Sequence, residues 1–241
     1  MRIYGLHPVL EALRAGRVAA IQISARSDDR IAEIVRLAES RGISVRRVAA
    51  AELDRAAGGS RHQGVVATLR DRDAPLKVEE LVRGARGTPL LVVLDGIEDP
   101  HNVGAIVRTV DAAGADGIVR QSRHAARLEG AAARASAGAL AHVRVAEVVN
   151  IARALEDLKE AGVWTIGLAG DAVKPYTEMD LTLPTAFVVG AEGVGLRRLV
   201  RERCDWLASI PMAGHVQSLN VSVAAGVALF EAVRQRRQAG R

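Results

Sequence analysis

A continuous run of apolar residues constrains the fold of this chain most. Residues 90–95 read LLVVLD, with no polar position before the final aspartate. Such a run is typical of a strand that is buried on both faces, as in a parallel sheet covered by helices. Similar runs recur between segments of helical periodicity, so we expect a parallel α/β sheet. The other runs are Gly117–Val119, Val163–Leu168, Ala186–Val189 and Leu207–Ile210, and the helical segments include Val103–Ala113, Ile151–Ala161, Arg197–Arg203 and a last helix from Val221 to about Arg237.

The first seventy residues predict a separate, smaller α/β unit. Their helical stretches are His7–Ala15 and Arg30–Ser40, and their extended stretches are Val18–Ala25, Ile43–Val48 and Gly64–Leu69. The segment that follows is rich in charge, proline and glycine, and it reads as a linker with a short helix near Val78–Val82. The predicted organisation is therefore a first domain at 1–70, a linker at 71–88 and a second domain at 89–241.

Positive charge is concentrated in the first domain. Residues 1–70 contain 12 lysines and arginines against 7 acidic residues, whereas residues 71–241 contain 21 of each. This imbalance predicts either a solubilising surface or a domain that binds RNA phosphates. Aromatic residues make up only 2% of the chain, so rows of bases stacked on aromatic side chains are not expected.

The chain carries few signs of export or of metal binding. Cys204 is the single cysteine, which excludes an intrachain disulfide and a site built from several cysteines. The six histidines lack metal-ligand spacing, so we expect no metal. The N-terminus does not read as a signal peptide, and no uncharged run approaches the ~18 residues that span a bilayer. We expect a cytoplasmic protein that does not enter membranes.

The first motif follows the apolar run and reads Asp95-Gly-Ile-Glu-Asp-Pro-His-Asn102-Val-Gly104, with Arg108 four residues further on. Asn102 is a plausible helix N-cap, and Gly104 lets a backbone or a ligand approach closely. With ~3.6 residues per turn, Asn102 and Arg108 need not lie far apart around the helix. The spacing alone nevertheless favours a capped helix with a solvated arginine.

The second motif is a strand that runs into a glycine-rich turn, Phe187-Val-Val-Gly190-Ala-Glu192-Gly193-Val-Gly195. Glycine turns at strand ends accommodate nucleoside or phosphate groups because the backbone can approach them. An ordinary strand-to-helix turn would explain the glycines equally well. A carboxylate inside the turn has no packing purpose, however, and Glu192 therefore points to a functional role.

The third motif is Ile210-Pro-Met212 followed, after four residues, by Gln-Ser218-Leu219-Asn220-Val-Ser222. Ser218 or Asn220 alone could simply cap the last helix. Several short hydrogen-bonding side chains beside an apolar stretch suit a ligand that has an adenine and a polar tail.

Together the three motifs resemble those of the SpoU/TrmH family, in the SPOUT superfamily of RNA 2′-O-ribose methyltransferases. The N-terminal segments IYGLHPVLEAL and HQGVVA also resemble the substrate-binding domain of members that methylate guanosine in 23S ribosomal RNA. The resemblance implies S-adenosylmethionine as the cofactor, ribosomal RNA or tRNA as the partner, and a homodimer. It also implies a C-terminal trefoil knot, which is a rare feature of protein chains.

Matching the motifs position by position implies a role for each residue. The reacting centre would contain Asn102, Arg108, Glu192, Ser218 and Asn220. The cofactor would contact Leu168, Ala169, Gly170, Gly190, Gly193, Ile210, Met212 and Leu219, mostly through the backbone. Residues 120–134, which are rich in alanine and arginine, depart from the family pattern and leave the RNA target open.

A guanidinium is a poor proton acceptor at neutral pH. We therefore interpret Arg108 as a clamp on the phosphate next to the ribose, which also stabilises negative charge on the ribose oxygen, while Asn102 and Glu192 orient that oxygen. Methylation of tRNA and a noncatalytic RNA-binding role remain as alternatives. A nicotinamide-dependent dehydrogenase is disfavoured, because the glycine spacing and position are wrong.

Overall fold

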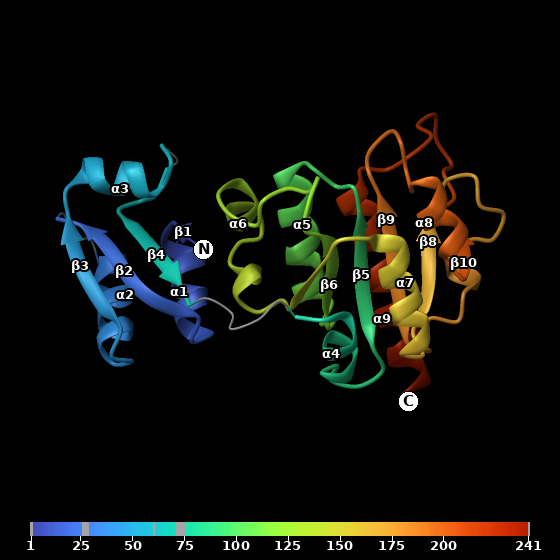
Figure 1. The fold of residues 1–241 in the computed structure, drawn as a ribbon, viewed down its shortest axis with the longest axis horizontal. Helices are drawn as coiled ribbons and strands as arrows, with labels where there is room; N and C mark the ends of the chain where they lie inside the picture. The colour runs from blue at the N-terminus through green and yellow to red at the C-terminus, as the bar shows by residue number, and fades with distance from the viewer. Residues whose placement is uncertain (1, 26–28, 60, 71–75, 241) are drawn as a thin grey trace.

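A computed structural model describes residues 2–25, 29–59, 61–70 and 76–240, and it places the described strands in two sheets (Figure 1). The first sheet has the order β1-β4-β2-β3 and the second the order β10-β8-β9-β5-β6-β7. All strand pairs of the second sheet are parallel, which confirms the predicted α/β class. The trefoil knot stays a prediction.

The described part of the N-terminal unit combines a mixed sheet with three helices. Strand β4 pairs antiparallel with both β1 and β2, and β2 pairs parallel with β3. The elements are β1 (Arg2–Tyr4), α1 (Leu6–Arg14), β2 (Val18–Ser24), α2 (Asp29–Glu39), β3 (Ser44–Val48), α3 (Ala50–Ala56) and β4 (Val65–Leu69). The sequence did not predict β1, which is only three residues long, or α3, whose buried face is a single leucine, Leu53.

The C-terminal unit wraps helices around the parallel sheet. Its elements are α4 (Val78–Arg83), β5 (Leu90–Asp95), α5 (Pro100–Ala112), β6 (Gly117–Gln121), α6 (Ala131–Ala135), η1 (Ala139–Ala141), β7 (Val145–Val148), α7 (Ile151–Glu160), β8 (Trp164–Leu168), η2 (Tyr176–Glu178), β9 (Thr185–Gly190), α8 (Arg198–Arg203), β10 (Trp206–Ala208) and α9 (Val221–Ala239). The short helix predicted near Val78–Val82 is therefore present. Strand β7 was not predicted, since it is a four-residue edge strand that carries a glutamate.

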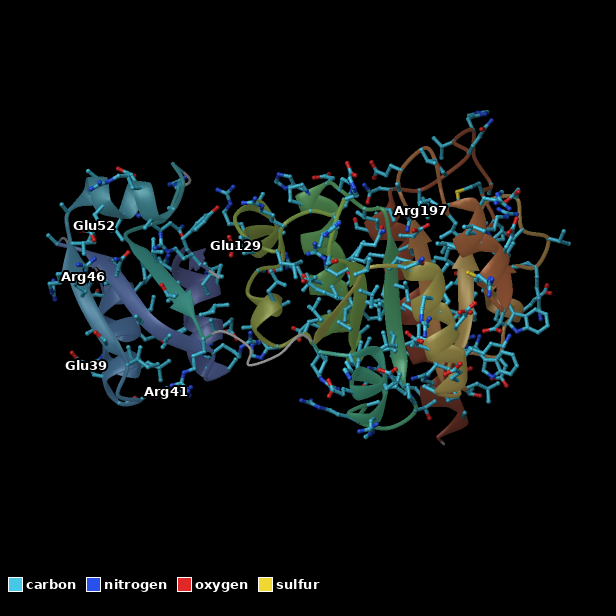
Figure 2. All side chains as sticks on the ribbon, in the orientation of Figure 1. Glu39, Arg41, Arg46, Glu52, Glu129 and Arg197 are labelled. Carbon is cyan, nitrogen blue, oxygen red and sulfur yellow. The ribbon has the colours of Figure 1, made fainter. Side chains whose placement is uncertain are left out.

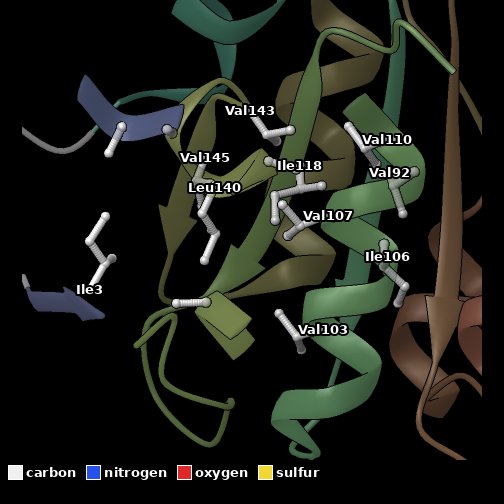
Figure 3. Packing of buried hydrophobic residues seen from close by; sticks show 14 of the residues in the cluster. Ile3, Val92, Val103, Ile106, Val107, Val110, Ile118, Leu140, Val143 and Val145 are labelled. Carbon is white, nitrogen blue, oxygen red and sulfur yellow. The ribbon is translucent and has the colours of Figure 1, made fainter. Parts of the chain in front are cut away.

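Strand β5 explains why the apolar run is so informative. Every residue of the strand is buried. Leu90, Val92 and Leu94 face a core that includes α5 and α9, whereas Leu91 and Val93 face a second core under α7. Figure 3 shows α5 packed against Val92 and the β6 residue Ile118 through Val103, Ile106, Val107 and Val110. A strand with helices on both faces cannot alternate polar and apolar residues.

The two units contact each other through β1 and α1 on one side and the segment that holds α6 and η1 on the other. Nε2 of His142 lies 3.2 Å from Oε2 of Glu11, and the guanidinium of Arg134 lies 5.5 Å from the ring centroid of Tyr4. Residues 71–75, the first part of the predicted linker, lie outside the described residues. In the part of the chain that is described, no helix is both long and apolar enough to cross a membrane.

Candidate functional site

The main cavity lies at the carboxyl edge of the parallel sheet. The chain builds β5, β6 and β7 toward one side and then crosses over to β8, so the strand order reverses beside β5. Ligands of open α/β sheets bind outside the carboxyl ends of the strands at such a reversal. A cavity of about 710 Å³ opens next to it, a size suited to a small-molecule ligand.

The cavity brings most of the predicted residues together. All the predicted cofactor contacts line it, namely Leu168, Ala169, Gly170, Gly190, Gly193, Ile210, Met212 and Leu219. Three predicted members of the reacting centre, Glu192, Ser218 and Asn220, line it as well. The walls therefore combine apolar side chains with backbone and carboxylate groups, which is the lining that a flat heterocycle with a charged tail needs.

Glycines are required where the turn after β9 folds back on the strand. A β-carbon at Gly190 would overlap the backbone of Gly195 and Leu196. Gly193 and Gly195 have φ angles of 76° and 70°, in the left-handed region that favours glycine. The amide of Gly195 donates to the carbonyl of Ala191 at 2.8 Å and closes the turn. These glycines thus serve to bring the turn over the end of the strand.

An ion pair with a buried carboxylate, which the sequence did not reveal, holds the far end of this turn. The Asp95 carboxylate, at the end of β5, accepts hydrogen bonds from the Arg197 backbone amide at 2.8 Å and from its Nε at 2.7 Å. The Asp95 side chain is 0% exposed, while that of Arg197 is 49% exposed. Arg197 lies at the edge of the sheet where β9 leads into α8 (Figure 2). The pair ties the glycine turn to the central strand.

Three side chains from three motifs form one polar cluster. Nδ2 of Asn102 donates to Oε1 of Glu192 at 3.1 Å. Nδ2 of Asn220 donates to the same oxygen at 2.5 Å and to Oδ1 of Asn102 at 2.9 Å. Asn102 is buried in α5, while Glu192 and Asn220 stand at the cavity. The structure thus joins residues that are 90 and 118 positions apart in the sequence.

Helix α9 fixes the orientation of this cluster. Asn220 is its N-cap, and Oδ1 of Asn220 accepts hydrogen bonds from the amide and the hydroxyl of Ser222. Nδ2 of Asn220 must then point toward Asn102 and Glu192. The Asn102 amide is oriented in turn, because its Oδ1 accepts from Asn220 and its Nδ2 is left to donate to Glu192. The cap that the sequence suggested for Asn220 is confirmed.

The expectation that Asn102 caps its own helix is wrong. Helix α5 begins three residues earlier than expected, at Pro100, and Asp99 is the N-cap, accepting from the amide of His101 at 2.9 Å. Proline is favoured at the first helical position and aspartate before it, so the Asp-Pro pair was the stronger start signal. Asn102 consequently lies inside the first turn, where its side chain is free to bond Glu192.

Arg108 is the one predicted member of the reacting centre that the structure keeps apart from the cluster. Six residues along a helix displace it by about 9 Å and about a third of a turn from Asn102. Its side chain is exposed and does not line the cavity. It makes no hydrogen bond or ion pair with any residue in the described ranges, so its role remains to be proposed.

Sequence reasoning also missed an ion pair at the cavity wall. Arg201 donates to both carboxylate oxygens of Asp171, at 2.8 and 3.0 Å, and both residues line the cavity. These hydrogen bonds lower the pKa of Asp171. The described residues contain no cluster of three or more histidine, cysteine or acidic side chains arranged to hold a metal. The absence of a metal stays a prediction.

Comparison with family models gives matches over nearly the whole chain. Residues 89–230 match the SpoU rRNA Methylase family, and residues 2–74 match the model for RNA 2′-O ribose methyltransferase substrate binding. The 23S rRNA (guanosine-2′-O-)-methyltransferase RlmB of Burkholderia sp is 45% identical over 237 residues, which cover 97% of this chain and 96% of the relative.

Solved structures agree with these matches. The SpoU methyltransferase AviRb from Streptomyces viridochromogenes, in complex with the cofactor AdoMet, is 27% identical with a TM-score of 0.83 and covers 99% of this chain and 91% of its own. The TrmH/SpoU tRNA modifying enzyme of A. aeolicus is 32% identical with a TM-score of 0.56, and the match covers 68% of this chain and 82% of that one.

Proposed function

The chain belongs to the SpoU rRNA methylase family, and from this we propose that it methylates the ribose 2′-hydroxyl of a guanosine in 23S ribosomal RNA. It is an S-adenosylmethionine-dependent RNA 2′-O-methyltransferase. The match to a 23S rRNA guanosine methyltransferase over 97% of this chain, including the N-terminal unit, is the observation that supports the substrate.

The cavity fits the cofactor of the family. Leu168, Ile210 and Leu219 offer apolar walls for an adenine, and exposed backbone at Gly190 offers polar groups close by. Bound there, S-adenosylmethionine would supply an electrophilic methyl group on a sulfonium. The transfer needs no other cofactor, so the chain has to position the ribose hydroxyl and manage its proton.

We assign the positioning of the hydroxyl to the polar cluster. Oε1 of Glu192 is already occupied by two amides, whereas its Oε2 accepts no hydrogen bond from the described residues. That oxygen is available to accept a hydrogen bond from the ribose 2′-hydroxyl. Because Asn102 and Asn220 fix the carboxylate beforehand, little reorganisation is needed when RNA binds. Ser218 lines the same wall and would contact the substrate beside it.

We place Arg108 at an interface between two copies of the chain. A β-carbon at Gly226 of α9 would lie 3.4 Å from Thr109, so α9 packs next to the residue that follows Arg108 in α5. Val223 and Phe230, each 49% exposed, lie on the same helix face as Gly226. A homodimer packed on this apolar stripe would bury it and let Arg108 clamp RNA phosphate next to the partner's cavity.

Two substitutions test the dimer and the clamp. Phe230→Asp should give a monomer by analytical ultracentrifugation, since a buried unpaired charge opposes association. Arg108→Lys should reduce turnover while RNA affinity changes little, because an ammonium cannot form the planar two-pronged contact. A dimeric Phe230→Asp variant would refute the proposed interface, and normal turnover of Arg108→Lys would refute the clamp.

The family of the chain also suggests a role for each domain. We propose that residues 1–70 bind the RNA substrate, that 71–88 link the units, and that 89–241 bind the cofactor and transfer the methyl group, in the cytoplasm where ribosomal RNA matures. A version that lacks 1–70 should bind S-adenosylmethionine normally and methylate RNA poorly. Loss of cofactor binding in that version would contradict this division.

Methylation of tRNA is the second candidate, since a tRNA modifying enzyme matches 68% of this chain in structure. The decisive experiment maps 2′-O-methylation across ribosomal RNA and tRNA from cells with and without the gene, followed by transfer of a labelled methyl group to each purified RNA. A 2′-O-methyl mark that disappears from a 23S guanosine supports the proposal. Loss of a tRNA mark alone would replace it with the second candidate.

A further inference from the structure

The arginine-rich segment of residues 120–134 has no part in the site described so far. It leads from β6 to α6, on the side of the C-terminal unit that faces the N-terminal sheet (Figure 1). A groove of about 620 Å³ lies there, lined from the N-terminal unit by Arg2, Tyr4, Arg55 and Thr68 and from this segment by Arg127 and Glu129. Figure 2 shows Glu129 between the two units.

The charge of the groove is strongly one-sided. Among the described residues that line it, three are arginines and one is a carboxylate. Arg2 and Arg127 are exposed and form no hydrogen bond or ion pair within the described ranges, and Arg55 uses only its Nε, on the carbonyl of Ala51 at 3.2 Å. Their remaining N–H groups are therefore available. Guanidinium groups in such a fork geometry bind phosphates with two parallel hydrogen bonds.

A cation–π contact beside the groove links the two units. Tyr4 is only 5% exposed, and the guanidinium of Arg134 lies 5.5 Å from its ring centroid. A cation over the face of an aromatic ring is attracted to it, so the contact couples β1 to α6. Arg134 is thereby engaged, and the arginines that line the groove stay free for a ligand.

The groove and the reacting centre lie at the same edge of the parallel sheet. The segment that carries Arg127 follows the carboxyl end of β6, and the polar cluster lies beyond the carboxyl ends of β5 and β9 in the same parallel sheet. Strands lie about 4.8 Å apart, so β6 is about 10 Å from β9. A chain of phosphates that crosses the groove can continue along this edge to the cavity.

We propose that this interdomain groove binds the sugar-phosphate backbone of the RNA that flanks the methylated nucleotide. The proposal rests on the proposed function and extends it, because RNA capture then depends on residues of the catalytic unit as well as on residues 1–70. The arginines contact phosphates, so they contribute affinity and position rather than sequence specificity.

Arginine substitutions at the groove test the proposal directly. Binding of full-length 23S rRNA transcript is measured against salt concentration for Arg55→Ala, Arg127→Ala and the double variant. Each lost phosphate contact should weaken binding several-fold and reduce the slope of log affinity against log salt by about 0.7 to 0.9. The KM for RNA should rise, while kcat and the affinity for S-adenosylmethionine stay within about two-fold.

A matched control and a gain of affinity make the test specific. Arg153→Ala removes the same charge from α7, which lies far from the groove, and should leave the salt slope unchanged (Figure 1). Glu129→Gln removes the one carboxylate and should tighten binding, an effect that misfolding cannot produce. Groove variants that bind RNA with the affinity and slope of Arg153→Ala would overturn the proposal.

Binding and methylation are read separately, so the two proposals can fail independently. If the wild-type protein leaves 23S rRNA unmethylated while the groove variants still lose affinity and salt slope, the proposed substrate is wrong and the groove stands. If the wild-type protein methylates a 23S guanosine and the groove variants bind normally, the proposed function stands and the groove is not the RNA site.

Discussion

Replacement of Arg197 by alanine should destabilise the C-terminal unit measurably. The substitution leaves the carboxylate of Asp95, which is 0% exposed, without its cation. In a fully buried ion pair, removal of one partner leaves the other charge buried and unpaired, which costs about 3–5 kcal/mol. Arg197 is 49% exposed and its backbone amide would still donate to Asp95, so water offsets part of the cost. We expect a loss of about 2 kcal/mol.

Thermal unfolding measures this loss. For a unit of ~150 residues, about 2 kcal/mol corresponds to a decrease in Tm of about 4–8 °C. The affinity for S-adenosylmethionine should fall as well, because the pair anchors the glycine turn that lines the cavity. Calorimetric titration of the folded variant at low temperature separates that effect from unfolding.

A neighbouring arginine supplies the control. Arg198 pairs with Glu202 one turn along α8, but the two side chains are 76% and 52% exposed. Exposed pairs of this kind contribute about 0.5 kcal/mol or less. Arg198→Ala should therefore shift the Tm by no more than about 2 °C. Equal shifts for the two variants would refute the reasoning, because burial of the partner carboxylate would then make no difference.

Three further outcomes are expected. Gly190→Ala should abolish S-adenosylmethionine binding in calorimetry, because a β-carbon would overlap the turn backbone, and normal affinity would contradict this. Asn220→Ser keeps a helix cap and loses the bond to Glu192, so methyl transfer should fall about 100-fold, whereas Asn220→Ala loses the cap as well and should cost about 1 kcal/mol more of stability than Asn220→Ser. Burial, with the nearby Asp205 and Asp95 carboxylates, raises the pKa of Cys204 to about 12, so at pH 8 its thiol should react with a thiol reagent only after denaturation.

Local patterns predicted those parts of the fold that depend on burial. Each interior strand of the parallel sheet was predicted from a short apolar run, because both faces of such a strand are covered. Edge strands show this signal less consistently, since β3 and β10 were predicted and two others were missed. The unpredicted β7 and β1 are both at the edge of their sheets, where a strand of three or four residues carries polar side chains without penalty.

The sequence did not predict which side chains pair across long separations in the chain. Nothing near Asp95 indicates that Arg197, 102 positions away, neutralises it. Arg236 is a second example, because in the sequence it is simply one of several arginines near the C-terminus. It instead donates to the carbonyls of Leu181, Leu183, Thr88 and Pro89, and so ties the end of α9 to the segments that enter β5 and β9.

The reacting centre shows how the motifs depend on one another. The cap of Asn220 on α9 is worth about 1 kcal/mol, whereas a hydrogen bond to a charged group contributes about 1.5–3 kcal/mol. The bond from Asn220 to Glu192 therefore holds the start of α9 at least as strongly as the cap itself does. Conversely, the cap sets which way each amide points. Formation of α9 therefore also orients the Glu192 carboxylate, and the site is ordered before RNA binds.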